Sequence, residues 1–200
     1  MWFGVLPRAV GFYVIQALFV GGPFVVLFCV IANYQLRTMR HLSLLSRKDG
    51  LTNLNNRRTF LELAEKRMTA GEGGVLILLD ADHFKRINDK WGHAVGDHCL
   101  IEISHRLKWN LRSRDVAGRI GGEEFAILLA GAAIQQARVI AGRIGQSIPF
   151  KADADNAHLA VTLSMGAVQI EEGVSLDALL VRADNALYEA KRQGRSRLII

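Results

Sequence analysis

The most constraining feature of this sequence is an acidic segment between two runs that are suited to β-strands. Residues 119–129 read Arg-Ile-Gly-Gly-Glu-Glu-Phe-Ala-Ile-Leu-Leu, with two glycines directly before two glutamates. Adjacent glycines between two strands predict a tight β-hairpin, and successive side chains of a strand point to opposite faces of the sheet. Glu123 and Glu124 are therefore expected at the hairpin tip, where one can bind a metal ion while the other has a different role. Without a second acidic element, the same hairpin would be an ordinary surface turn.

A second acidic element lies upstream. The short apolar run 76–79 ends abruptly in Asp80-Ala81-Asp82, which predicts a buried strand with carboxylates at its carboxyl end. Two acid-tipped elements in one small domain favour a divalent-cation site with oxygen ligands, the environment that Mg²⁺ prefers. The two segments together therefore predict a magnesium site.

The first part of the chain has the composition of a membrane segment. No charged residue occurs over residues 9–36, a run longer than the roughly 20 apolar residues that cross a bilayer. Basic residues follow at once: Arg37, Arg40, Arg47 and Lys48. By the positive-inside rule, this pattern predicts a transmembrane segment over 1–36, a juxtamembrane coupling helix over 37–48, and a cytoplasmic location for all that follows.

Other interpretations of this segment stay open. A cleaved signal peptide would have a shorter apolar core, with charge before it and a small-residue cleavage site after it. A buried helix of a soluble core fits less well, because the run is long and ends in cations. Gly21-Gly22-Pro23 could divide it into two shorter pieces, so the number of membrane passes is open. The coupling helix has apolar residues at a spacing that would allow a short coiled coil.

Cysteine content and net charge exclude other classes of protein. Cys29 lies in the apolar run and Cys99 in a helical pattern, so neither disulfide nor metal spacing is supported. Much of the net charge of +6 is juxtamembrane, where anionic lipid explains it as well as nucleic acid does. Aromatic residues interleaved with basic ones, which a single-strand binder needs for base stacking, are missing. We therefore expect no nucleic-acid partner.

Hydrophobic periodicity divides residues 49–200 into alternating helices and strands. Asp49-Gly50-Leu51-Thr52 is expected to cap the first helix. The predicted helices span 57–69, about 97–111, 133–148 and 176–190; the predicted strands span 75–79, 159–170 and 196–200; a loop is predicted at 151–158. Because the acidic hairpin requires antiparallel pairing, the predicted fold class is α+β, with a mixed, largely antiparallel central sheet flanked by helices.

The segment after the first long strand is dense in groups that can bind a nucleotide. Lys85 can neutralise a phosphate, and the amide of Asn88 can donate to and accept from a base edge. Asp97, expected near the start of the next helix, is either a partner of the helix dipole or an acceptor for the N–H groups of guanine. Taken singly, each is more typical of a solvated surface than of a ligand site.

Several separate motifs coincide, and residues 49–200 resemble the GGDEF family of diguanylate cyclases. The motifs occur in order: Asp49-Gly50-Leu51-Thr52 with Asn56-Arg57-Arg58, Asp80-Ala81-Asp82-His83-Phe84-Lys85 with Asn88-Asp89, Gly92-His93 with Gly96-Asp97, Gly121-Gly122-Glu123-Glu124-Phe125, and Ala190-Lys191 with Gly194-Arg195. The third signature position of the family accepts Asp or Glu, so Glu123 is a permitted variant, whereas Ser196 stands where the family commonly has Asn. The resemblance implies the nucleotide-cyclase palm, or ferredoxin-like GGDEF fold, in a signalling enzyme at the bacterial cytoplasmic (inner) membrane.

The resemblance also implies a role for each matching residue. The Mg²⁺ ligands, with Mn²⁺ as a substitute ion, would be Asp80, the backbone carbonyl of Ala81, and Glu123. The catalytic residues would be Glu123, Glu124 and Lys85. GTP would be bound by Asn88, His93, Asp97, Lys85, Lys191 and Arg195. Two GTP molecules would condense into cyclic di-GMP and two pyrophosphates, in a homodimer with two-fold symmetry because one domain holds one GTP.

Arg112 and Asp115 match the RxxD inhibitory site of the family, at which cyclic di-GMP binds. An arginine and a carboxylate can together bind guanine and phosphate groups. The alternative is a surface ion pair between residues three apart on a helix. We favour the product site because of its distance from the acidic hairpin.

Two other function classes remain. A degenerate GGDEF domain could be a receptor that binds cyclic di-GMP or GTP without turnover, but the intact acidic signature argues for activity. A structural membrane adaptor would leave the acidic, basic and amide residues of the motifs without a shared purpose. A cyclase for a different purine would need base-reading groups other than Asn88 and Asp97.

Overall fold

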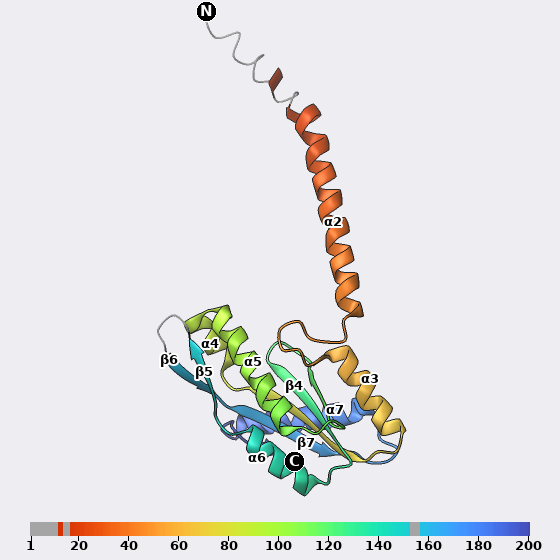
Figure 1. Ribbon diagram of the computed structural model, residues 1–200, viewed down its shortest axis with the longest axis vertical. Helices are drawn as coiled ribbons and strands as arrows, with labels where there is room; N and C mark the ends of the chain where they lie inside the picture. The colour runs from red at the N-terminus through yellow and green to blue at the C-terminus, as the bar shows by residue number, and fades with distance from the viewer. Residues whose placement is uncertain (1–11, 14–16, 153–156) are drawn as a thin grey trace, which may run out of the picture. The chain divides into compact units, whose positions relative to one another are not determined.

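The chain divides into two compact units, Met1–Ser46 and Arg47–Ile200 (Figure 1). The computed structural model describes residues 12–13, 17–152 and 157–200, and within these it gives the backbone alone for residues 17–18, 36–45 and 157. Each unit is considered by itself below.

The described part of the first unit is helical. A π-helical segment, η1 (Ala17–Gly21), leads into the long helix α2 (Gly22–Leu45). Nowhere in the described ranges does a helix combine the length and the apolar character needed to span a bilayer. The predicted transmembrane segment over 1–36 is therefore not supported, because α2 begins only at Gly22 and continues through the basic residues after position 36. Residues 1–11 and 14–16 of that prediction, and the side chains of the expected coiled coil, lie outside the described residues.

The second unit is built on a six-stranded mixed sheet with the order β1-β3-β4-β2-β7-β8. Its strands are β1 (Asn55–Asn56), β2 (Gly74–Ala81), β3 (Val116–Arg119), β4 (Glu124–Ala130), β7 (Leu163–Gln169) and β8 (Leu198–Ile199). The four inner strands pair antiparallel. The short outer strands β1 and β8 run parallel to β3 and β7. A separate hairpin consists of β5 (Ile148–Ala152) and β6 (Ala157–Val161).

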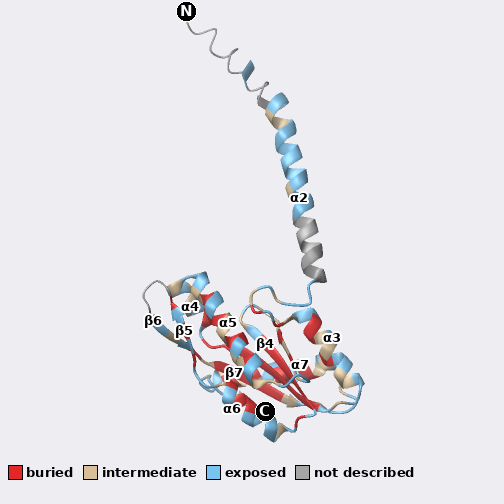
Figure 2. Cartoon of the chain, viewed as in Figure 1, coloured by how far each residue is buried: buried red, intermediate tan, exposed pale blue. Residues whose placement is uncertain are grey.

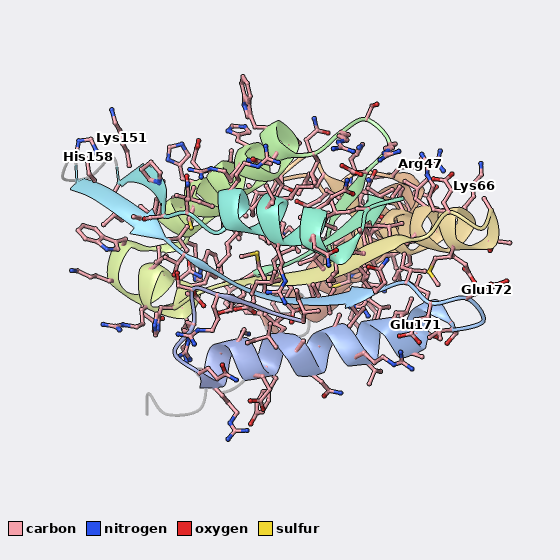
Figure 3. All side chains as sticks on the ribbon, turned by 90° about the horizontal axis from the view of Figure 1, so that it is seen from below. Arg47, Lys66, Lys151, His158, Glu171 and Glu172 are labelled. Atoms are coloured by element: carbon pink, nitrogen blue, oxygen red, sulfur yellow. The ribbon has the colours of Figure 1, made fainter. Side chains whose placement is uncertain are left out.

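Helices cover both faces of the sheet. One face carries α3 (Arg57–Thr69) and α7 (Leu176–Arg192). The other carries α4 (Phe84–Trp91), α5 (His93–Asn110) and α6 (Ile134–Ile144). Figure 3 shows α7 along one side of the sheet and α6 on the opposite side. This α+β architecture confirms the predicted fold class of a mixed central sheet flanked by helices.

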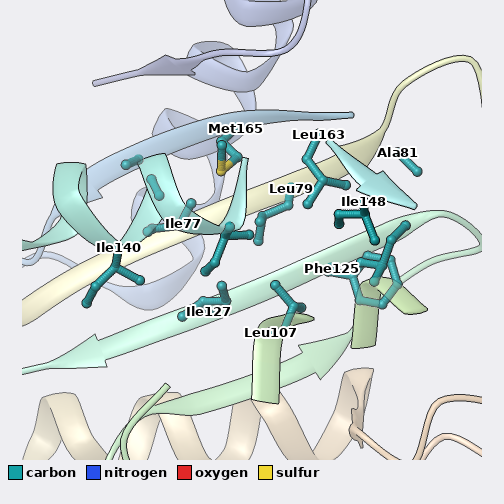
Figure 4. Packing of buried hydrophobic residues seen from close by; sticks show 14 of the residues in the cluster. Ile77, Leu79, Ala81, Leu107, Phe125, Ile127, Ile140, Ile148, Leu163 and Met165 are labelled. Carbon is teal, nitrogen blue, oxygen red and sulfur yellow. The ribbon is translucent and has the colours of Figure 1, made fainter. Parts of the chain in front are cut away.

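The central strand β2 is buried along its whole length because both faces of the sheet are covered (Figure 2). Ile77 and Leu79 pack in the core beneath α5 and α6, together with Phe125 of β4 (Figure 4). Leu76 and Leu78 pack in the second core, beneath α3 and α7. Alternation along a strand thus divides one apolar run between two cores. Asp80 follows Leu76 and Leu78 in the same alternation, so its side chain lies on the face of the sheet that carries α7.

Two predictions about strands and loops were wrong. The predicted loop at 151–158 contains parts of β5 and β6. Burial alternates regularly along β5, with Pro149 and Lys151 at the exposed positions. Lys151 and His158 pair across this hairpin at one end of the unit, opposite the end where Glu171 and Glu172 follow β7 (Figure 3). The predicted strand 159–170 is divided between β6 and β7; a break that we expected near Gly166 is not found there, because Gly166 lies inside β7.

Helix starts also differ from the prediction. Residues 84–91 form the helix α4, which was not predicted because polar residues dominate this segment. Helix α5 begins at His93, so Asp97 lies about one turn inside the helix and not at its first turn. Helix α3 occupies the predicted range, but its N-cap is Asn56, whose side chain accepts a hydrogen bond from the Thr59 N–H at 2.9 Å.

The position of α7 depends on a close backbone approach at Gly166. A Cβ atom at this position would clash with the backbone of Ala183 and Leu187 in α7. Glycine therefore allows α7 to lie directly on β7. Ser175 caps the start of this helix, accepting from the Ala178 N–H at 3.3 Å. The carboxyl end of α7 then delivers basic residues to the end of β2.

Candidate active site

Asp80 is the centre of the candidate site. It lies near the end of β2, in register with Glu124 of β4 on one side and Ser164 of β7 on the other. Its side chain is only 8% exposed, and its Oδ2 is 2.7 Å from the Nζ of Lys191. Burial raises the pKa of the Asp80 carboxyl above its usual value, while the hydrogen bond and charge of Lys191 act in the opposite direction. The centre of the site is therefore a nearly buried carboxyl group with one cation beside it.

Glu123 and Glu124 complete a carboxylate cluster with Asp80. The N–H of Ala81 donates to the carbonyl of Glu123 at 3.2 Å, which holds the hairpin tip against the end of β2. Burial raises the pKa of Glu123, and the charges of Asp80 and Glu124 raise it further. Both neighbouring carboxylates thus repel Glu123, and Lys191 offsets part of that repulsion. The structure thus confirms that the two acidic segments meet.

The acidic hairpin is held by Arg119. Its guanidinium donates twice to the carbonyl of Gly122, at 2.7 and 3.1 Å, and once to Asp49 Oδ1 at 3.2 Å. Asp49 also accepts from the backbone and hydroxyl of Thr52. Although burial alone would raise it, these hydrogen bonds hold the pKa of Asp49 below its usual value. We expected Asp49 to cap a helix, and did not assign a role to Arg119; the pairing of residues 70 positions apart has no local signal in the sequence.

Gly121 and Gly122 were expected to provide the backbone freedom of a tight turn, but the turn does not need glycine for that reason. Neither Gly121 nor Gly122 has a positive φ angle, so the turn does not require their conformational freedom. A Cβ atom at Gly121 would instead clash with the side chain of Glu124. The absence of a side chain there leaves room for the carboxylate.

Asn88 presents an unpaired acceptor. Its Oδ1 is buried and has no hydrogen-bond partner among the described residues. A Cβ atom at Gly96 in α5 would fall on this oxygen, so Asn88 Oδ1 can lie this close to α5 only because position 96 is glycine. A buried polar atom without a partner is costly unless a ligand supplies the missing hydrogen bond. Asp97 follows Gly96 directly and is exposed, so it is available to the same ligand.

The remaining predicted nucleotide-binding residues fall into two groups. Lys191 contacts Asp80, and the charge of Arg195 also acts on that carboxylate. Lys85 and His93 are exposed on the first turns of α4 and α5, and the structure gives neither a contact with the carboxylate cluster. Lys85 makes no ion pair within the described part of the chain, which leaves its charge available.

Arg112 and Asp115 lie apart from the carboxylate cluster. They line a cavity of about 290 Å³ together with Lys48 and Lys108. Asp115 uses its carboxylate to accept from the backbone N–H of Arg112 at 2.9 Å and of Ala130 at 3.2 Å. The alternative of a surface ion pair is not realised, since no salt bridge joins the two side chains in the described structure. The Arg112 guanidinium is exposed.

The carboxylate cluster fits a divalent metal ion. No group of three or more His, Cys, Asp and Glu side chains in the described ranges is arranged as a complete metal site. The expected ligand set needs only two side chains, Asp80 and Glu123, with the carbonyl of Ala81. Mg²⁺ is often bound by one or two carboxylates together with substrate phosphates and water. The repulsion that Asp80 and Glu124 exert on the partly buried Glu123 is the observation that favours a cation here.

Residues 46–197 match the family model described as diguanylate cyclase, GGDEF domain. The chain belongs to the GGDEF family. Its relatives include the probable diguanylate cyclase DgcT of Escherichia coli strain K12, 36% identical over 163 residues that cover 78% of this chain and 36% of the relative. The diguanylate cyclase DgcP of Pseudomonas aeruginosa is 41% identical over 157 residues, which cover 75% of this chain and 23% of DgcP. The chain thus spans well under half the length of these relatives.

Solved structures agree with this family and fold. The GGDEF domain of DgcB from Caulobacter crescentus, in complex with c-di-GMP, has a TM-score of 0.73 at 33% identity, covering 77% of this chain and 95% of that chain. The diguanylate cyclase SiaD from Pseudomonas aeruginosa, in complex with its activator SiaC, has a TM-score of 0.70 at 32% identity, covering 98% of this chain and 79% of SiaD. The family is one of enzymes, and its members generally use divalent metal ions.

Proposed function

We propose that this chain condenses two GTP molecules into cyclic di-GMP with release of two pyrophosphates. The carboxylate cluster of Asp80, Glu123 and Glu124 beside Lys191 is the observation that carries the proposal. A GGDEF domain that has lost activity needs no such cluster, whereas phosphoryl transfer needs charge stabilisation at the reacting phosphorus.

Each group of residues has a distinct task in the proposed reaction. Asn88 and Asp97 would read guanine, since the unpaired Asn88 Oδ1 is suited to a base N–H. Lys85, Lys191 and Arg195 would neutralise the triphosphate, with His93 at the edge of the nucleotide site. Cations placed in this way hold the α-phosphorus in position for attack by the 3′-oxygen of the second GTP.

The acidic hairpin would supply the base and the metal ligands. When the 3′-oxygen forms its bond to the α-phosphorus, the bond to pyrophosphate breaks and the hydroxyl proton passes to Glu123 or Glu124. A divalent ion bound by Asp80, Glu123 and the Ala81 carbonyl would supply Lewis-acid stabilisation of the transferring phosphoryl group, with Mg²⁺ proposed and Mn²⁺ as a substitute.

Assembly and regulation belong to the same proposal. Because one domain holds one GTP, we propose a homodimer with two-fold symmetry in which two sites face each other. Cyclic di-GMP would bind at Arg112 and Asp115 and inhibit the enzyme. The SiaD neighbour is bound to an activator protein, and a protein activator is a further candidate partner for this chain. We propose the cytoplasm, where GTP and Mg²⁺ are available, as the location of the catalytic unit.

The test is product analysis. The purified chain is incubated with GTP and MgCl₂, and nucleotides are separated by liquid chromatography and identified by mass. Cyclic di-GMP and pyrophosphate in a ratio of about one to two are expected, with specific activity that rises with enzyme concentration because each site needs two subunits. Tight binding of GTP or cyclic di-GMP without turnover, at concentrations where the chain is dimeric, would favour the receptor alternative instead.

A further inference from the structure

Asp82 is a buried carboxylate to which the proposed reaction assigns no task. It lies two residues after Asp80 and, like Asp80, is only 5% exposed. Its Oδ1 accepts from the hydroxyl of Ser164 at 2.6 Å, and its Oδ2 accepts from the hydroxyl of Thr162 at 2.6 Å. The third donor is the backbone N–H of Ser196, 3.1 Å from Oδ2. Charge-assisted hydrogen bonds of this kind are short and strong, so Asp82 ties together three separate segments.

The Ser196 end of this network is a strained turn. Residues 194–196 join α7 to β8, and all three have positive φ angles: 109° for Gly194, 63° for Arg195 and 48° for Ser196. Residues other than glycine adopt this conformation only where their surroundings hold them there. The Arg195 N–H donates to the carbonyl of Ala190 at 2.9 Å, and the Met165 N–H donates to the carbonyl of Arg197 at 2.8 Å. Between these two backbone bonds, Arg197 Nε donates to the carbonyl of Arg195 at 3.0 Å, and the Ser196 N–H donates to Asp82, the contact that joins the turn to the end of β2.

The turn carries a residue of the candidate site. The charge of Arg195 lies close enough to Asp80 to favour the ionised form of that carboxylate, against the larger opposite effect of burial. Lys191 needs no such support, because it belongs to the regular helix α7. Arg195 follows the end of the helix, so its direction depends on the turn.

We propose that Asp82 is a positioning residue that holds Arg195 at the triphosphate site. By accepting the Ser196 N–H, its carboxylate fixes the strained turn against the end of β2, the strand that carries Asp80. The proposal rests on the proposed function for the identity of the ligand, GTP. The competing explanation is that Asp82 only stabilises the β6–β7 connection through Thr162 and Ser164.

The two explanations are separated by a double-mutant cycle on nucleotide binding. The dissociation constant of a non-hydrolysable GTP analogue is measured with Mg²⁺ for the parent, Asp82→Ala, Arg195→Ala and the double variant. Loss of one charge-assisted contact to phosphate is expected to weaken binding by about tenfold to a hundredfold. If Asp82 acts through Arg195, Asp82→Ala weakens binding by a similar factor, and the double variant is no weaker than Arg195→Ala alone.

The matched controls are Thr162→Val and Ser164→Ala. Each removes one hydroxyl donor to Asp82 and leaves the Ser196 contact in place. We expect both to lower the melting temperature with little change in the dissociation constant or in the KM for GTP. Independent, multiplying effects of Asp82→Ala and Arg195→Ala, or controls that weaken binding as much as Asp82→Ala does, would overturn the proposal.

A second measurement does not depend on nucleotide. Trypsin cleavage after Arg195 and Arg197, followed by mass spectrometry, should accelerate in Asp82→Ala relative to cleavage elsewhere, and remain at the parent rate in the two controls. If Asp82→Ala does not fold, Asp82→Asn replaces it, since the amide oxygen can still accept the Ser196 N–H and an intermediate effect is expected. An unchanged cleavage rate at the turn in both Asp82 variants contradicts the proposal. A parent chain that makes no cyclic di-GMP refutes the proposed function alone, because the cleavage rates still decide the role of Asp82.

Discussion

At the scale of single residues, the end of β2 carries more negative than positive charge. Asp80, Glu123 and Glu124 contribute three carboxylates, and Lys191 and Arg195 act on them as cations. Burial raises the pKa of both Asp80 and Glu123; the charge of Asp82 adds to this effect at Asp80, and the charges of Asp80 and Glu124 add to it at Glu123. A group whose pKa is raised by folding stabilises the fold below its unfolded pKa and loses that contribution as pH rises through the folded value. A bound cation would reverse the loss, because it favours the ionised carboxylates.

Mg²⁺ should therefore stabilise the protein in a pH-dependent way. We expect millimolar MgCl₂ to raise the melting temperature at about pH 7.5 and to have little effect at about pH 4, where carboxyl groups with raised pKa are protonated. Asp80→Asn should abolish the Mg²⁺ effect and the activity, whereas Asp177→Asn, at an exposed acid of α7, should retain both. Differential scanning fluorimetry with and without the ion measures the shift. An equal Mg²⁺ shift in the parent and in Asp80→Asn would contradict the assigned ligand.

Gly96 provides a test of guanine recognition that leaves Asn88 itself unchanged. The Cβ of Gly96→Ala would fall on Asn88 Oδ1, the free end of a side chain that can rotate away. Because Gly96 lies in α5 and its φ angle is not positive, alanine suits the backbone. We expect the KM for GTP to rise about tenfold or more, the cost of one lost hydrogen bond to a buried group, with little change in melting temperature.

The matched control for Gly96→Ala is Gly142→Ala. Gly142 also lies in a helix, α6, but nothing stands within 4 Å of its added Cβ. Its KM for GTP should equal that of the parent in the same steady-state assay. If the two alanine variants have the same KM, the Asn88 amide does not contact the base.

At the scale of secondary-structure elements, the acidic hairpin depends on a residue outside its tip. Arg119 joins the Gly122 carbonyl to Asp49, which belongs to the segment before β1. The Arg119 and Asp49 side chains are 16% and 24% exposed, so this ion pair is more protected than most on the surface. Its bidentate contact with Gly122 fixes the backbone that carries Glu123.

Arg119→Ala should therefore lower kcat more than it changes the KM for GTP. A displacement of the hairpin by about an ångström can cost roughly a hundredfold in rate. Arg182→Ala is the control, because it breaks an exposed ion pair with Glu171 and should change neither parameter. Steady-state kinetics with pyrophosphate detection decides the matter. A parent-like kcat in Arg119→Ala would mean that the hairpin keeps its position without this arginine.

Regular elements were predictable where one periodic signal dominated. The apolar run before Asp80 and the stripe of α3 gave β2 and α3 nearly to the residue. Helix α4 was missed because polar residues dominate its sequence, and β5 was missed because Pro149 and Lys151 face outward. The contacts that complete the site, from Arg119 to Asp49 and from Asp82 to Ser196, join residues distant in sequence. No local pattern encodes such contacts, whereas the motif residues themselves were found from their order along the chain.

At the scale of the whole molecule, the proposed catalysis and feedback both depend on how two domains meet. In the proposed reaction the carboxylate cluster of one domain holds one GTP, so a ligand that holds two domains apart would stop the reaction. Arg112 is suited to bind such a ligand, because Asp115 is occupied by backbone N–H groups and leaves the guanidinium exposed. Lys108 and Lys48 add positive charge to the same cavity.

We therefore expect cyclic di-GMP to inhibit the enzyme, and Arg112→Ala to relieve that inhibition while the initial rate stays near that of the parent. Loss of a bidentate arginine contact to guanine costs about 1–3 kcal/mol, which corresponds to a shift of roughly one to two orders of magnitude in the inhibitory concentration. Pyrophosphate release is measured at fixed GTP over a range of added cyclic di-GMP, for the parent, Arg112→Ala, and Arg138→Ala as a control at an exposed arginine of α6. Because Arg112 contacts no residue of the carboxylate cluster, a large fall in its uninhibited rate would indicate a folding defect, which the melting temperature reveals. Superimposed inhibition curves for the parent and Arg112→Ala would show that the cavity beside Asp115 is not the product site.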